Sequence, residues 1–125
     1  MEKVKKKEKV KDVVDPSDIF VSILWKQGLA TGESIYMTME DIIQGAPAAD
    51  PVPQDVRDYT LSLWDSLTFE DLEPYDENLD FLADCFSFYE DFEEYIKNHK
   101  CYTVGYVYSR DGARPFCSID FYVFV

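Results

Sequence analysis

The clearest pattern of apolar and polar positions lies at the C-terminal end of the chain. Residues 101–109 and 115–125 alternate between the two classes and are rich in Val, Tyr and Phe. This period of two predicts strands, and the Asp-Gly pair between them predicts the turn of a β-hairpin. A turn centred on Gly112 would place Val107 on one face with Cys117, Ile119, Phe121 and Val123. It would place on the other face Tyr102, Val104, Tyr106, Tyr108, Phe116, Tyr122 and Phe124.

Helical spacing appears in the middle of the chain. Apolar residues recur at i, i+3, i+4 and i+7 over residues 53–67, which predicts a helix there. Thr38 with Asp41, and Thr68 with Asp71, match the spacing of a capping box, in which each side chain caps the other residue's backbone. The first pair predicts a short helix that ends at Gly45, and the second predicts a single turn.

Residues 76–98 predict one long amphipathic helix. When successive residues are placed 100° apart, all the acids except Glu93 fall on one arc. The apolar side chains, Phe88 and Tyr89 among them, fall on the other arc, which would face the core. The alternative is a break in the helix, because Ser87-x-x-Glu90 also has capping-box spacing.

The N-terminal third is ambiguous between helix and strand. Asp15 followed by Pro16 is typical of a helix start, and the apolar residues at 19, 20, 23 and 24 would form a stripe on a helix that ends at Gly28. A run this rich in Ile, Phe and Val fits a buried strand as well. Residues 33–38 predict a short strand.

Together these elements predict an α+β fold, in which three to four helices pack on a small antiparallel sheet dominated by the C-terminal β-hairpin. The 125 residues give room for one core. We therefore expect a flexible basic N-terminal arm over residues 1–14 and a single acidic α+β domain over residues 15–125.

Charge changes this picture. The formal net charge is -13, yet residues 1–11 hold six Lys and two Glu, so the remainder of the chain is more acidic still. Between Asp58 and Ile96 there are thirteen Asp or Glu residues and no Lys or Arg. Such a surface excludes direct binding to nucleic acid phosphates, which needs clustered Lys and Arg, and instead attracts basic partners.

The candidate partner-binding site is the acidic face of the predicted long helix with the turn before it. The eight carboxylates between Asp76 and Glu94 would span about 27 Å of helix, or about one charge per 3.4 Å, close to the phosphate spacing of one DNA strand. A merely solvated helix face remains the alternative. The predicted partner-binding residues are Glu70, Asp71, Glu73, Asp76, Glu77, Asp80, Asp84, Glu90, Asp91 and Glu94.

Signals for catalysis or metal binding are weak. Asp76-x-Asn78-x-Asp80 begins like a calcium loop, but Phe81 stands where that loop requires Gly. His99 is the only histidine, the three cysteines form no close pair, and the glycines form no phosphate loop. No apolar run reaches the ~18 residues of a membrane helix. We expect a cytoplasmic, non-enzymatic protein without cofactor, metal or membrane contact.

In its size, acidity and aromatic content the chain is similar to the small phage- and plasmid-encoded inhibitors that mimic DNA. This resemblance of composition implies an anti-defence inhibitor, which would occupy the basic groove of a nucleic-acid-binding protein. The alternative is a protein-interaction or scaffold domain that associates through the tyrosine-rich hairpin, as a monomer or as a homodimer.

Overall fold

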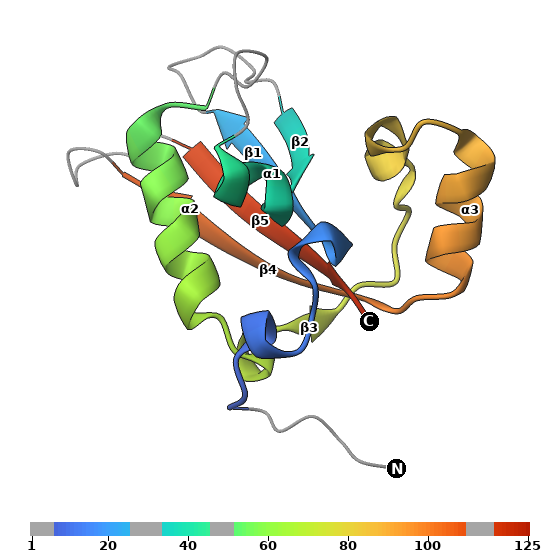
Figure 1. Cartoon of the computed structure of the whole chain (residues 1–125), viewed down its shortest axis with the longest axis horizontal. Coiled ribbons are helices and arrows are strands. Elements are labelled where there is room, and N and C mark those ends of the chain that lie inside the picture. The colour runs from blue at the N-terminus through green and yellow to red at the C-terminus, as the bar shows by residue number, and fades with distance from the viewer. Residues whose placement is uncertain (1–6, 26–33, 46–51, 110–116) are drawn as a thin grey trace.

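The computed structural model describes residues 7–25, 34–45, 52–109 and 117–125. These form a five-stranded antiparallel sheet in the order β2-β1-β5-β4-β3, with helices packed against it (Figure 1). The predicted α+β class, with helices on a small antiparallel sheet and a C-terminal hairpin, is confirmed. The strands are β1 (Ile19–Trp25), β2 (Ser34–Thr38), β3 (Glu73–Pro74), β4 (Cys101–Tyr108) and β5 (Cys117–Phe124). The α-helices are α1 (Met39–Gln44), α2 (Gln54–Ser66) and α3 (Tyr89–Lys97).

The hairpin is present, but its register differs by one residue from the prediction. Tyr106 lies opposite Ile119 and Tyr108 opposite Cys117, so the pairing is symmetric about the bond between residues 112 and 113. A shift of one residue moves every side chain of a strand to the other face. The predicted faces of β4 were therefore wrong. The turn itself, residues 110–116, lies outside the described residues.

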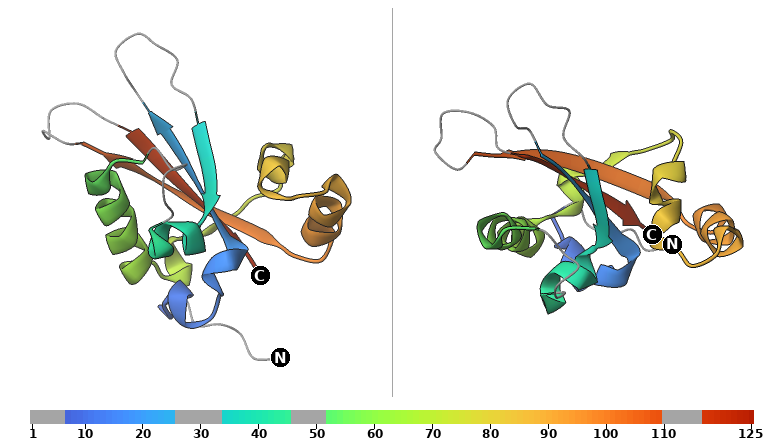
Figure 2. Two further views of the ribbon diagram at one scale, coloured as in Figure 1. Left: turned by 45° about the horizontal axis from the view of Figure 1, so that its top comes forward. Right: turned by 90° about the horizontal axis from the view of Figure 1, so that it is seen from above.

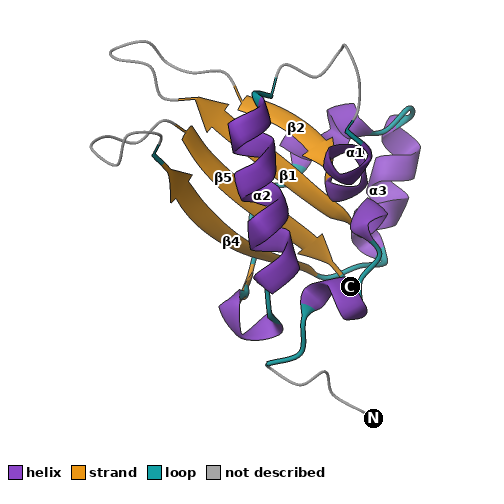
Figure 3. Ribbon diagram, turned by 60° about the vertical axis from the view of Figure 1, so that its left-hand side comes forward, coloured by secondary structure: helices purple, strands orange, loops and turns teal. Residues whose placement is uncertain are grey.

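One face of the sheet packs against α1 and α2, and we call the apolar cluster between them the first core. Figure 3 shows α2 lying across the strands. Val56, Thr60 and Trp64 are the buried positions of α2. They face β1 and β5, whose inward side chains are fully or almost fully buried: Ile19, Val21, Ile23, Cys117, Ile119, Phe121 and Val123.

Strand β1 resolves the ambiguity of the N-terminal third. The side chain of Asp15 accepts a hydrogen bond from the Ser17 backbone at 2.9 Å, and Pro16 opens a single 3-10 turn, η2 (Pro16–Asp18). The chain then continues as a strand that pairs with β2 on one side and β5 on the other. An interior strand is covered on both faces, which explains why its sequence is an apolar run interrupted only by Ser22. The predicted end at Gly28 lies outside the described residues.

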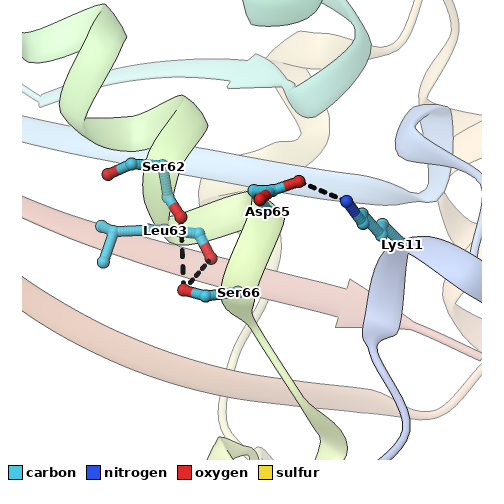
Figure 4. A network of polar contacts seen from close by, with 5 residues as sticks. All are labelled: Lys11, Ser62, Leu63, Asp65 and Ser66. Carbon is cyan, nitrogen blue, oxygen red and sulfur yellow. Dashed lines mark hydrogen bonds and ion pairs between the residues drawn. The ribbon is translucent and has the colours of Figure 1, made fainter.

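The residues before Asp15 belong to the fold from Glu8 onward. Val10, in the 3-10 turn η1 (Val10–Asp12), is fully buried in the first core, and its N–H donates to the Leu67 carbonyl at 2.9 Å. Lys11 forms an ion pair with Asp65 on α2 (Figure 4). The folded part therefore starts earlier than the predicted boundary at residue 15. Residues 1–6 of the predicted arm lie outside the described residues.

Both capping boxes form as predicted. Thr38 caps α1 and exchanges hydrogen bonds with Asp41, and α1 ends at Gly45 with a φ of 65°. Thr68 and Asp71 form the same arrangement around the single turn η3 (Phe69–Asp71).

The single long helix over residues 76–98 was wrong. The segment contains a 3-10 helix, η4 (Asp80–Cys85), then an extended connection, then α3. Leu82 and Phe92 are both fully buried in one cluster with Phe20 and Phe124, on the other face of the sheet from α2, which we call the second core. A straight helix would hold Leu82 and Phe92 about 15 Å apart. The chain turns between them, so that both reach this core.

Candidate functional site

The acidic segment, residues 70–94, carries all ten predicted partner-binding residues. The structure places them on successive elements: Glu70 and Asp71 on η3, Glu73 on β3, Asp76 and Glu77 in the following loop, Asp80 and Asp84 on η4, and Glu90, Asp91 and Glu94 on α3. All ten are exposed. Within the described part of the chain, none of them forms an ion pair with Lys, Arg or His.

The site differs in shape from the predicted one. In Figure 1, η3 lies at the lower edge of the sheet, while η4 and α3 lie side by side at the right-hand end; Figure 2 shows the same two elements together from two further directions. The carboxylates therefore do not follow a single helix axis. The match between a helical charge spacing and the phosphates of one DNA strand does not apply to this segment as folded.

Two of the ten carboxylates also support the local fold. Asp71 accepts hydrogen bonds from the Thr68 backbone N–H and side-chain hydroxyl, both at 3.1 Å. Glu94 accepts a bond of 3.0 Å from the side-chain amide of Asn98 at the end of α3. These contacts hold the two side chains in place but leave both residues exposed.

Phe88 and Tyr89 were predicted to be buried and are instead exposed. Phe88 is 64% exposed and Tyr89 54% exposed. Both lie between the end of η4 and the first turn of α3, directly before Glu90 and Asp91 in the chain. The pKa of the Tyr89 phenol is raised, first by the charge of Asp80 and further by that of Glu93, which places this ring among carboxylates. The sequence prediction missed their exposure because it continued one helical phase through residues 86–88, where the helix is in fact interrupted. The Ser87 capping signal pointed to the break, although the cap is Phe88 and not Ser87.

Hydrogen bonds of the first turn of α3 fix the backbone at Phe88 and Tyr89. The Phe88 carbonyl accepts hydrogen bonds from the N–H groups of Asp91 at 3.1 Å and Phe92 at 3.3 Å, which starts α3. The Phe92 ring is fully buried and lies 5.5 Å from the ring of Phe86. The aromatic packing of the second core therefore fixes where the exposed rings stand.

The tyrosines of the hairpin are largely part of the fold. The Tyr108 ring lies 4.7 Å from that of Tyr59 on α2, and its hydroxyl donates to Asp55 at 3.1 Å. Tyr106 packs against the first core, and burial raises the pKa of its phenol. Tyr122 packs in the second core. These side chains offer less free area to a partner than the alternating pattern implied.

The histidine and two of the cysteines, His99, Cys85 and Cys101, are held by contacts within the fold. The His99 ring stacks on that of Tyr95 at 4.1 Å, with Nδ1 2.7 Å from the Tyr95 carbonyl, which favours the tautomer in which Nδ1 donates. His99 borders a surface hollow of about 480 Å³. Burial raises the pKa of the Cys85 thiol to about 11 and that of Cys101 to about 12, and this lowers their reactivity at neutral pH.

Within the described residues, no three His, Cys, Asp or Glu side chains group so as to hold a metal ion. No described helix is both long and apolar enough to cross a membrane.

Comparisons with known proteins return no match. No protein family matches the chain, and neither does any curated protein or any solved structure.

Proposed function

We propose that this protein is a non-enzymatic inhibitor that binds a nucleic-acid-binding protein in the manner of a DNA mimic. In this proposal the acidic segment occupies the basic groove that would otherwise take nucleic acid. The observation that carries the proposal is the exposure of ten carboxylates over residues 70–94, none of them neutralised by a described cation.

A surface of a single charge sign costs the protein some stability. Like charges four apart on a helix, as Glu90 and Glu94 are on α3, destabilise it by a few tenths of a kcal/mol. Surfaces that serve only for solvation usually mix both signs. A single-sign surface raises the association rate with an oppositely charged partner and discriminates against acidic ones. The retained repulsion therefore supports a recognition role.

Exposure of these side chains also favours fast, salt-sensitive binding. Exposed charges lose most of their interaction beyond about 10 Å at 0.1 M salt. We expect complexes that form at low salt and dissociate as salt rises. A partner with a nucleic-acid groove supplies the clustered Lys and Arg that such binding needs.

The first experiment is affinity capture from cell extract at low and at moderate salt, with the intact chain as bait. Enrichment of nucleic-acid-binding proteins that elute with salt supplies the partner. Nucleic acid should then compete with the protein for that partner, since both would occupy the same groove.

The second experiment reverses charge on the site. Asp80→Lys, Asp84→Lys and Asp91→Lys together should weaken binding at least tenfold and flatten its salt dependence, because three attractive contacts become repulsive. The matched control is Asp12→Lys, Glu40→Lys and Asp58→Lys, which makes the same change in net charge on η1, α1 and α2. Equal losses in the two triple variants, or no loss in the first, would refute a localised site.

A further inference from the structure

Phe88 and Tyr89 are the most exposed large apolar side chains of the described residues. Aromatic rings normally contribute their area to a core, as Phe92 does three residues later. Here two neighbouring rings are exposed, one at the N-cap and one at the first residue of α3. Large exposed apolar side chains rimmed by polar groups are typical of interaction sites.

The surroundings of the pair define what could cover it. Glu90 and Asp91 follow Tyr89 directly in the first turn of α3 and are exposed, and the charges of Asp80 on η4 and Glu93 on α3 act on the Tyr89 phenol. The faces of aromatic rings are electron-rich, so they attract cations as the carboxylates do. Exposed aromatic rings and carboxylates thus lie close together. A group that complements both must be planar, to stack on the rings, and positively charged, to pair with the carboxylates.

We propose that Phe88 and Tyr89, with the carboxylates around them, form an anchor that binds arginine side chains of the partner in preference to lysine. The inference depends on the proposed function, because it names the partner chemistry of the same acidic segment. A guanidinium group is planar, stacks on rings and bonds carboxylates through two N–H groups at once. An ammonium group is a strongly hydrated point charge that uses the ring face less well.

With exposed rings among the carboxylates, the surface resembles a single strand of nucleic acid more than one strand of a duplex. Proteins that bind single strands combine a positive groove with flat side chains on which bases stack. A ring flanked by carboxylates presents to such a groove what an unstacked base between phosphates presents. The bent path of the acidic segment, with rings at the bend, fits this arrangement better than the regular charge row of a duplex strand.

The test uses two labelled peptides of equal charge, nona-arginine and nona-lysine, titrated with the intact protein at low salt. The unaltered protein should bind the arginine peptide more tightly. Phe88→Ala and Tyr89→Ala should each lower the ratio of the two affinities by about two- to fivefold, the range of one exposed cation–π contact. The triple change at Asp80, Asp84 and Asp91 should weaken both peptides together.

Three further variants separate the ring from other effects. Tyr89→Phe keeps the ring and should keep the arginine preference. Phe88→Leu keeps apolar area without a ring and should behave as Phe88→Ala does. Val13→Ala removes an exposed apolar side chain from another part of the surface and should change nothing. Because all of these side chains are exposed, the fold should tolerate the changes, which circular dichroism checks.

The outcomes distinguish this inference from the proposed function. An unchanged affinity ratio in both alanine variants, with salt-sensitive binding intact, overturns the arginine anchor and leaves the acidic site standing. Failure of the unaltered protein to bind either peptide at low salt overturns both. Loss of the preference in the alanine variants, with retention in Tyr89→Phe, supports the anchor.

Discussion

Replacing Gly105 by alanine should destabilise the protein, and the sign of the effect should reverse when Asp120 is also removed. Gly105 on β4 lies opposite Asp120 on the central strand β5. A Cβ added at Gly105 would lie 2.5 Å from the Oδ1 atom of Asp120 and 3.7 Å from its Cγ. The first distance is far below van der Waals contact, so the Asp120 carboxylate would have to rotate.

The expected change in the free energy of unfolding combines two destabilising effects and one stabilising effect. Moving the Asp120 side chain off its preferred rotamer costs about 0.5–1.5 kcal/mol. Disturbing the contacts of a half-buried polar group costs about 1 kcal/mol more. Alanine in place of glycine within a strand returns about 0.5–1 kcal/mol, because the unfolded chain is less free. We expect Gly105→Ala to lower the free energy of unfolding by about 1 kcal/mol.

The assay is urea unfolding of Gly105→Ala, Asp120→Ala and the double variant, followed by tryptophan fluorescence. With Asp120 already alanine, Gly105→Ala should stabilise by about 0.5–1 kcal/mol, which gives a coupling of about 2 kcal/mol between the sites. Gly45→Ala is the control: its φ of 65° strains any side chain, but no atom lies within 4 Å. Its cost should be the same with and without Asp120. A coupling below about 0.5 kcal/mol at Gly105 would refute the reasoning.

Four further predictions test other parts of the structure. Phe92→Ala should lower the free energy of unfolding in urea by about 3–5 kcal/mol, because it leaves a cavity in the second core. A loss below about 1 kcal/mol would contradict that packing. Val10→Ala should cost about 2 kcal/mol, whereas an unchanged midpoint would mean that residues 8–14 are not part of the fold. Thr38→Ala should cost about 1 kcal/mol through loss of the α1 cap, and Thr38→Ser should restore most of it. At pH 8, Cys85, with a pKa of about 11, should react with iodoacetamide on the order of a hundredfold more slowly in the folded than in the unfolded chain, because the thiol stays protonated. Cys101, with a pKa of about 12, should react on the order of a thousandfold more slowly. Both rates should rise as the pH nears 11, and equal rates in the folded and unfolded chain by mass spectrometry would argue against burial.

The sequence predicted best those elements that are decided by neighbouring residues. The capping boxes at Thr38 and Thr68 formed because a side chain and a backbone N–H three residues apart meet in any helical turn. The helix of α2 and the two hairpin strands followed from periodicity sustained over eight or more residues.

Predictions that needed long-range information were less successful. The run from Ile19 could not be assigned to helix or strand until the pairing of β1 with both β2 and β5 was known. The hairpin register depended on the centre of the turn, which lies half a residue beyond Gly112, between residues 112 and 113. Val10 gave no local signal for its burial, because its partners are Leu67 and the side chains of the first core.

In the candidate site, too, local properties were predicted correctly and those that depend on long-range packing were not. All ten acids were correctly expected at the surface, since charged side chains are rarely buried unless paired. Phe88 and Tyr89 were wrongly placed in the interior, because a single helical phase was carried through a bend that only the packing of Leu82 and Phe92 requires.

By itself, then, the sequence determined the class of fold, the caps at Thr38 and Thr68, the presence of the hairpin and the single-sign charge of residues 58–96. These are properties of composition and of contacts within a few residues, which physical chemistry fixes without the rest of the chain. The tertiary structure alone decided where the acidic segment bends and which aromatic rings remain outside. Both depend on contacts between residues far apart in the chain, because Leu82 and Phe92 pack with Phe20 and Phe124 in the second core. The rings of Phe20, Phe86, Phe92 and Phe124 fill that core, and Phe88 and Tyr89 are left facing solvent among the acids.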